Sequence, residues 1–353
     1  MSVDLVGSTA FKAEKAAQEY ESSRVKPKWV GVFTDFYEAF PQALKRQYVL
    51  GEGKLVDGEK DLYPRIWKTI GDEIILCSRI LNIEHLAHTM DSFIATLKEY
   101  SVVVKRADNK LDVKGNAWVA ACPAPNFGFA LNPKEAPDPD GLDTSEATEA
   151  IIDLVPHKYD FLGKAIDTGF RVSKNSRADR CTVSAQLAFV LAEAEIRRLT
   201  NFKLDFDGRT ELKGVNNGIP YPVVFIDTET DDNKIDLIYT EKELSSKNDF
   251  KPEKLKAFLA AFMKVASIDH PYICRRNQEL PVEDKPESFV NFEKAFRKLI
   301  EGIEQQDKTF ADAEMAPDAG DDVANTEGAI LDSTLDGLIE EADNANQTAK
   351  DEG

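Results

Sequence analysis

The spacing of hydrophobic residues along the chain predicts helices interleaved with short strands. Apolar residues at helical spacing predict helices over residues 9–20, 25–50, 81–98, 164–173, 187–199, 252–267 and 289–305. Short apolar or alternating runs predict strands over residues 3–6, 66–70, 74–76, 110–125, 181–183, 211–215 and 221–227. In the second helix the bulky residues share one face and are expected in the core: Phe33, Phe36, Tyr37, Phe40, Leu44 and Tyr48.

Residues 66–77 have the pattern of two strands joined by a tight turn, with Gly71 and Asp72 at the turn. A carboxylate at the tip of such a hairpin is held by backbone on both sides, which suits a metal ligand. An ordinary Gly-Asp turn is the alternative interpretation, and this segment alone favours it.

A short strand carrying Asp4 is predicted to lead into Gly7, Ser8 and Thr9, where the first helix begins. Ser8 or Thr9 can cap that helix, and the free amide groups at a helix start suit a phosphate. A plain cap is the alternative. Only three residues precede Asp4, so either the strand is short or the protein begins upstream.

Residues 159–171 form the third informative segment, in which a turn at Gly163 is predicted to open a helix. Asp167 and Arg171 are four residues apart, so they share a face of that helix. A surface ion pair worth a few tenths of a kcal/mol is the simplest explanation of this spacing.

The charge of the 353-residue chain is −19, and much of it lies at the C-terminal end. Residues 311–353 contain 13 acidic residues and one Lys, which leaves about −7 for the remainder. A mildly acidic body makes a nucleic-acid partner a poor expectation. We predict one domain over residues 1–230, a helical extension over 231–306 and an acidic, disordered tail over 307–353.

The cysteines and histidines are scattered, which predicts neither a disulfide framework nor a zinc site. Cys77, Cys122 and Cys181 lie in apolar stretches, as small core residues of a protein in the reducing cytosol would. His85 and His88 share a predicted helix but have no further ligands nearby in sequence. The chain contains no membrane-length apolar run and no signal-peptide pattern, so we expect a cytoplasmic protein without membrane partners.

Taken together, three segments resemble class III nucleotidyl cyclases: residues 3–9 (Val-Asp-Leu-Val-Gly-Ser-Thr), 68–72 (Lys-Thr-Ile-Gly-Asp) and 160–171. The resemblance covers residues 1 to about 227. It implies an α+β fold with a ferredoxin-like core, an antiparallel sheet flanked by helices, followed here by a helical C-terminal extension and the acidic tail. It also implies a lyase that converts a nucleoside triphosphate into a 3′,5′-cyclic nucleotide and pyrophosphate.

The resemblance assigns a role to several of these residues. Asp4, Asp72 and the carbonyl of Leu5 would hold two divalent cations, Mg²⁺ or Mn²⁺, which prefer oxygen ligands. Arg171 matches the arginine that stabilises charge in the transition state. Asp167 stands where most of the family has the Asn that orients the ribose. Three residues would bind the triphosphate at the helix start: Gly7, Ser8 and Thr9.

Lys68 and Asp160 match the pair that reads the base in the adenylate branch of the family. In this family each site forms across a homodimer, which gives two equivalent sites. One subunit would supply Asp4 and Asp72, and the other would supply Lys68, Asp160, Asp167 and Arg171.

Other features resemble the pyrimidine cyclases of bacterial Pycsar antiphage defence, whose products activate a separate effector. They are residues 166–171, residues 114–118 (Lys-Gly-Asn-Ala-Trp) and the absence of an attached sensor module. We therefore favour UTP as the substrate and cyclic UMP as the product, with CTP next. The alternatives are an adenylate cyclase that makes cyclic AMP and a catalytically dead cyclase-like binding protein.

Overall fold

The computed structural model describes residues 1–19, 27–135, 145–244, 250–276 and 281–314. The chain divides into two compact units, Met1–Phe292 and Glu293–Gly353, and the first contains every strand described below. The strands are β1 (Ser2–Val6), β2 (Arg65–Ile70), β3 (Glu73–Cys77), β4 (Asp112–Ala117), β5 (Phe127–Ala130), β6 (Tyr159–Leu162), β7 (Arg180–Val183), β8 (Leu204–Thr210) and β9 (Tyr221–Asp227).

The helices are α1 (Ser8–Glu19), α2 (Lys28–Leu50), α3 (Ile83–Ala107), α4 (Glu146–Leu154), α5 (Lys164–Val172), α6 (Ala185–Ile196), α7 (Asp232–Leu244), α8 (Pro252–Val265) and α9 (Glu287–Glu314). Short 3-10 helices lie at Glu52–Lys54, Asp57–Glu59, Pro133–Glu135, Pro156–Lys158, Ser173–Asn175 and Asn216–Gly218. None of the described helices is long and apolar enough to cross a membrane.

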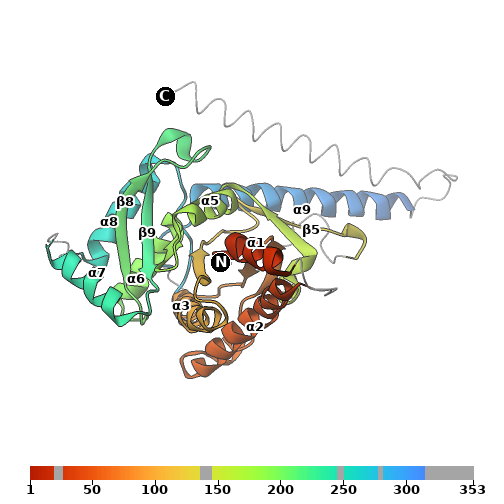
Figure 1. Cartoon of the computed structure of the whole chain (residues 1–353). Coiled ribbons are helices and arrows are strands. Elements are labelled where there is room, and N and C mark those ends of the chain that lie inside the picture. The colour runs from red at the N-terminus through yellow and green to blue at the C-terminus, as the bar shows by residue number, and fades with distance from the viewer. Residues whose placement is uncertain (20–26, 136–144, 245–249, 277–280, 315–353) are drawn as a thin grey trace. The chain divides into compact units, whose positions relative to one another are not determined.

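Seven strands form one sheet in the order β2-β3-β1-β4-β7-β9-β8. Strands β8 and β9 lie side by side at one edge of it (Figure 1). Every neighbouring pair in it is antiparallel except β4 and β7, which run parallel. Strands β5 and β6 form a separate two-stranded ribbon. The predicted fold class is therefore confirmed: a mainly antiparallel sheet flanked by helices.

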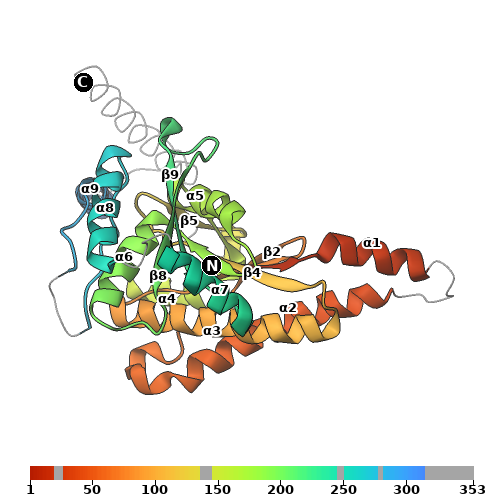
Figure 2. The same ribbon diagram turned by 60° about the vertical axis from the view of Figure 1, so that its left-hand side comes forward.

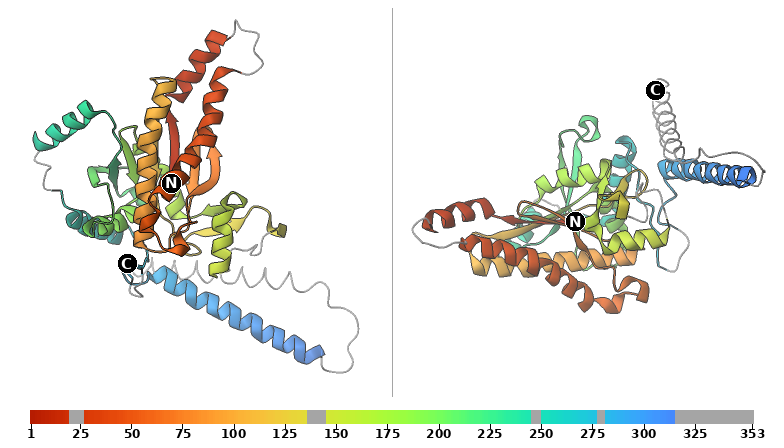
Figure 3. Two further views of the ribbon diagram at one scale, coloured as in Figure 1. Left: turned by 90° about the horizontal axis from the view of Figure 1, so that it is seen from below. Right: turned by 90° about the vertical axis from the view of Figure 1, so that its right-hand side faces the viewer.

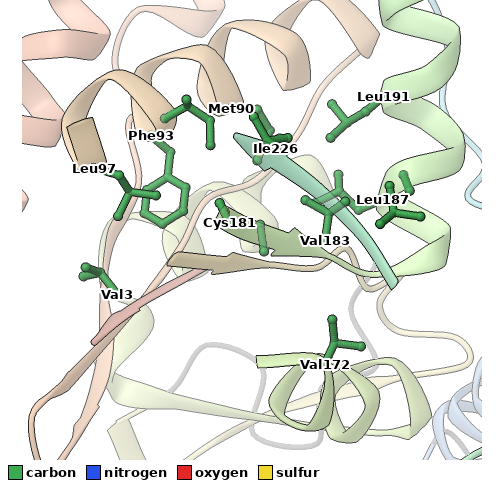
Figure 4. Close-up of a cluster of buried hydrophobic side chains, with 14 of the residues drawn as sticks. Val3, Met90, Phe93, Leu97, Val172, Cys181, Val183, Leu187, Leu191 and Ile226 are labelled. Carbon is green, nitrogen blue, oxygen red and sulfur yellow. The ribbon is translucent and has the colours of Figure 1, made fainter. Parts of the chain in front are cut away.

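Helices cover both faces of the sheet. Helices α2 and α3 lie on one face and α5 lies on the other, as Figures 2 and 3 show. Figure 4 shows the main core between the sheet and two helices, α3 with Phe93 and Leu97, and α6 with Leu187 and Leu191. Helix α3 turns an apolar face toward the strands, whereas α6 is apolar and buried on all sides because α8 packs on it as well.

Helix α2 confirms the predicted aromatic face. Phe36, Phe40 and Tyr48 are fully buried, and Phe40 packs edge-on against Tyr100 of α3 with ring centroids 5.4 Å apart. Tyr37 is only partly buried, and its hydroxyl donates a hydrogen bond to the carbonyl of Gly71. The same helix therefore supports both the core and the tip of the β2–β3 hairpin.

Helix α8 packs on the sheet through aromatic contacts. Phe262 meets Tyr221 at 5.5 Å between centroids, and Phe258 meets Phe206 at 5.1 Å. Further along, the Arg276 guanidinium donates through Nε to the fully buried carboxylate of Glu59 at 3.1 Å. The predicted boundary at residue 230 stays a prediction. Residues 315–353 of the predicted tail lie outside the described part of the chain.

Three local predictions are wrong. The final hairpin pairs β9 with residues 204–210, and residues 211–215 lie in the connection, where Gly214 has a φ of +74°. The strand predicted over residues 110–125 ends at Ala117. Cys122 is exposed, because it lies beyond the end of that strand, whereas Cys181 is buried as expected.

His85 is buried at the start of α3, where its Nε2 lies 2.9 Å from the hydroxyl of Tyr48. Burial lowers the pKa of this imidazole to about 4. The unfolded chain binds the proton near pH 6.5, so it holds more protons than the folded protein between these values. Folding stability should therefore fall as the pH is lowered from about 6.5 to 4.

We expect this histidine to remove about 3 kcal/mol from the free energy of unfolding between pH 7 and pH 4. Urea unfolding at both pH values, compared with His85→Gln, measures its share. The comparison is needed because burial also lowers the pKa of the neighbouring His88. Equal pH dependence in the two proteins would contradict the prediction.

Candidate functional site

The predicted metal-binding carboxylates lie at the same end of two neighbouring strands. β1 pairs antiparallel with β3, with Asp4 opposite Glu73. The backbone amide of Leu5 donates to the carbonyl of Asp72 at 3.3 Å, which joins the strand to the hairpin tip. The structure thus brings together Asp4, Leu5 and Asp72, which are up to 68 positions apart in the sequence.

The turn between β1 and α1 sets the third part of this group. Gly7 has a φ of +81°, and a Cβ there would overlap the carbonyl oxygen of Lys110, so only glycine fits. The helix begins at Ser8, whose buried hydroxyl donates to the Asp72 carboxylate. The Ser8 hydroxyl therefore joins the helix start to the hairpin, and a cap by Ser8 or Thr9 stays a prediction. Thr9 is exposed.

Lys114, which sequence reasoning did not select, lies directly opposite Asp4 on β4. Its Nζ is 2.9 Å from Oδ2 of Asp4, so a protein cation already contacts this carboxylate. Burial raises the pKa of Asp4, and the charge of Asp72 raises it further, while Lys114 acts in the opposite direction. Burial also raises the pKa of Glu73, with the charge of Asp4 adding to the effect.

The predicted base-reading residues form a direct ion pair. Nζ of Lys68 on β2 lies 2.6 Å from Oδ1 of Asp160 on β6. The same ammonium lies over the ring of Trp67, 4.0 Å from its centroid. Trp67 is nearly buried and donates through Nε1 to the carbonyl of Tyr159 at 3.0 Å. The Trp67 indole therefore packs against the Lys68 ammonium, and its hydrogen bond joins β2 to β6.

Helix α5 is held at its start by Asn126. The Oδ1 atom of this buried residue accepts from the amide of Ala165 at 3.0 Å, and Nδ2 donates to the carbonyl of Ala121 at 2.9 Å. Gly163 precedes the helix with a φ of +139°, and a side chain there would overlap Asn126. The predicted glycine turn is confirmed, and Asn126 is a support that the sequence pattern did not reveal.

Further along α5, Asn116 Nδ2 donates to the carbonyl of Gly169 at 2.9 Å. Arg171, near the end of the helix, lies beside the β8–β9 connection. A Cβ atom added to Gly214 in that connection would be 3.6 Å from Nη2 of Arg171. Asp167 is exposed. Within the described residues the structure gives no ion pair between Asp167 and Arg171, although the helix places them on one face.

The candidate residues thus fall into two groups within one chain. The first surrounds Asp4 and Asp72, and the second consists of the Lys68–Asp160 pair and helix α5. No hydrogen bond or ion pair connects the two groups across the described part of the chain.

The first group has the donor chemistry of a hard divalent cation: two carboxylates and a backbone carbonyl, all oxygen. No group of three or more His, Cys, Asp and Glu residues suited to a metal occurs among the described residues. Mg²⁺ commonly binds through one or two carboxylates together with substrate phosphates, so two carboxylates are sufficient for a metal that arrives with a nucleotide. Lys114 is the feature that opposes such binding, since it already neutralises Asp4.

Comparison with solved structures finds nucleotidyl cyclases. The adenylyl cyclase CyaB from P. aeruginosa shares 14% identity, with a TM-score of 0.38, over 65% of this chain and 93% of that one. The guanylate cyclase domain of RhGC from Catenaria anguillulae, solved with GTP, shares 12% identity, with a TM-score of 0.38, over 64% and 92%. No protein-family model and no curated protein matches the chain. At these values the likeness does not assign an activity.

Replacing Asn126 by Ala should loosen helix α5. We expect the free energy of unfolding to fall by about 1–2 kcal/mol, because the amide of Ala165 loses its capping acceptor. Asn201→Ala is the control, because Asn201 is exposed and its side chain bonds to Asp91 instead of α5. Urea unfolding measures both variants, and a loss in Asn126→Ala no larger than in Asn201→Ala would show that the cap is not the stabilising contact.

Proposed function

We propose that this protein is a nucleotidyl cyclase that converts a nucleoside triphosphate into a 3′,5′-cyclic nucleotide and pyrophosphate. The observation that carries the proposal is the meeting of Asp4 and Asp72 beside the start of helix α1. Carboxylates for divalent cations and free helix amides for phosphates are the two requirements of a triphosphate site. Here the turn after β1 supplies the helix amides, and the β2–β3 hairpin brings Asp72 beside it.

The reaction joins the 3′-oxygen to the α-phosphorus and breaks the bond from that phosphorus to the bridging oxygen of pyrophosphate. Bound divalent cations would lower the pKa of the 3′-hydroxyl and neutralise the phosphates. Asp4, Asp72 and the carbonyl of Leu5 would hold them. Gly7, Ser8 and Thr9 would lie against the triphosphate.

The second group of residues would act on the rest of the substrate. Arg171 would stabilise the charge that develops on the α-phosphate, and its place on a clamped helix limits its freedom. Asp167 would accept a hydrogen bond from a ribose hydroxyl, which its exposure on α5 permits. We propose that a twofold homodimer joins this group to Asp4 and Asp72 of the other subunit.

The Lys68–Asp160 pair offers one donor and one acceptor to a base. Lys68 keeps two further protons, and Oδ2 of Asp160 has no hydrogen-bond partner among the described residues. This arrangement complements O4 and N3–H of uracil, and equally N1 and the amine of adenine. Our preference for UTP over CTP and ATP therefore rests on the sequence resemblance to pyrimidine cyclases. By the same resemblance, cyclic UMP would activate a separate effector in antiphage defence.

The proposal predicts that the purified protein with Mn²⁺ forms a cyclic product from UTP in preference to CTP, ATP and GTP. Chromatography of the four reactions measures the product. Asp72→Ala should remove it, because the cation loses a ligand, while light scattering still reports the dimer. Absence of any cyclic product from all four nucleotides would refute the enzyme. Cyclic AMP alone would refute the pyrimidine preference, and full activity of Asp72→Ala would refute the metal assignment.

Lys114 provides a test that does not depend on turnover. Replacing it by Met removes the cation that contacts Asp4, so Mn²⁺ should bind about fivefold more tightly, or ~1 kcal/mol. Electron paramagnetic resonance of free Mn²⁺, without nucleotide, measures the affinity. Lys110→Met is the matched control, because Lys110 pairs with Glu14 instead. Unchanged or weaker binding in Lys114→Met would mean that Lys114 and Mn²⁺ do not compete for Asp4.

A further inference from the structure

A cavity of about 500 Å³ lies at the end of the sheet opposite to the Asp4–Asp72 group. It is bounded by the end of β3, the first turns of α3 and α6, the segment after β4 and residues 269–273. Neither the metal group nor the Lys68–Asp160 pair lines it. We propose that this cavity is a second binding site, for a small, neutral, aromatic molecule.

The walls of the cavity favour an aromatic occupant. Trp67, Trp118 and Phe161 line it together with Leu86 and Met90. The rings of Trp67 and Phe161 meet edge to face at 5.1 Å between centroids. Cavities of about 300–1,000 Å³ with mostly apolar and aromatic walls are typical sites for small molecules.

The charges around the cavity favour a neutral occupant. Nε of Arg79 lies 2.7 Å from the Glu149 carboxylate, so both of these charges are paired. Asp153 lies 3.0 Å from Nη1 of Arg65 and accepts from the amide of Arg79 at 2.6 Å. The Asp269 carboxylate accepts from the Ser288 hydroxyl and has no ion-pair partner among the described residues, so it disfavours an anion. A charged ligand would also lose its hydration among the apolar walls.

An occupant of the cavity would contact Trp67, whose ring carries the Lys68 ammonium at 4.0 Å. A bound molecule would therefore change the position of Lys68. An effect of this change on base recognition rests on the proposed function, whereas binding of the molecule to the cavity does not.

The test uses the intact protein and 2-naphthol, whose excited state loses its proton to water, so the neutral-form share of its emission rises when the molecule is shielded from water. We expect a saturable rise in this share with one site per chain. Ile80→Trp, which fills the cavity, should abolish it, and Leu50→Trp, which adds the same ring at an exposed position outside the cavity, should leave it intact. No saturable emission, or loss in both variants equally, would overturn the proposal.

A further measurement locates the molecule. In the protein labelled with 5-fluorotryptophan, the ¹⁹F resonances of Trp67 and Trp118 should shift on binding, and that of Trp29 should not. A shift at Trp29 alone would place the molecule elsewhere. None of these readouts requires turnover, so a failed cyclase assay would leave the result intact.

Discussion

The placement of β1 between β3 and β4 is the constraint on which the candidate site depends. The register that sets Asp4 opposite Glu73 on one side sets it opposite Lys114 on the other. A slip of one residue would turn Asp4 to the opposite face of the sheet. The buried Val3 and Leu5, which alternate with it, oppose such a slip, because they would then leave the core.

The negative charges in this row destabilise the folded protein unless positive charges lie close to them. Two half-buried carboxylates, Asp4 and Glu73, lie side by side, and burial raises the pKa of each. A single ammonium, Lys114, balances them in the protein alone. Two carboxylates with Asp72 beside them exceed what one lysine neutralises, so the group retains an attraction for added positive charge. That imbalance is the physical basis of the proposed cation site.

Local signals in the sequence predicted much of this arrangement. The Gly71–Asp72 turn, the glycine before α5 and the aromatic face of α2 each follow from residue types within a few positions. Lys114 could not be found in this way, because its partner is 110 positions away and only the β1–β4 register reveals it. The sequence predicts the first strand of the final hairpin at residues 211–215 instead of 204–210. The reason is that Gly208, with a φ of +79°, interrupts the alternating pattern of side chains along β8.

In the second group of site residues, the side chain of Trp67 affects both members of the Lys68–Asp160 pair. Lys68 is held by a carboxylate from β6 and by the ring of Trp67, so its position depends on two elements that are about 90 residues apart. Trp67 in turn faces the cavity and bonds to the carbonyl of Tyr159, the residue before Asp160. Any group that moves the indole therefore acts on both members of the pair at once. The Trp67 ring contacts the Lys68 ammonium of the proposed base-reading pair and also lines the proposed ligand cavity. Selectivity for the base would therefore respond to a molecule that fills this cavity.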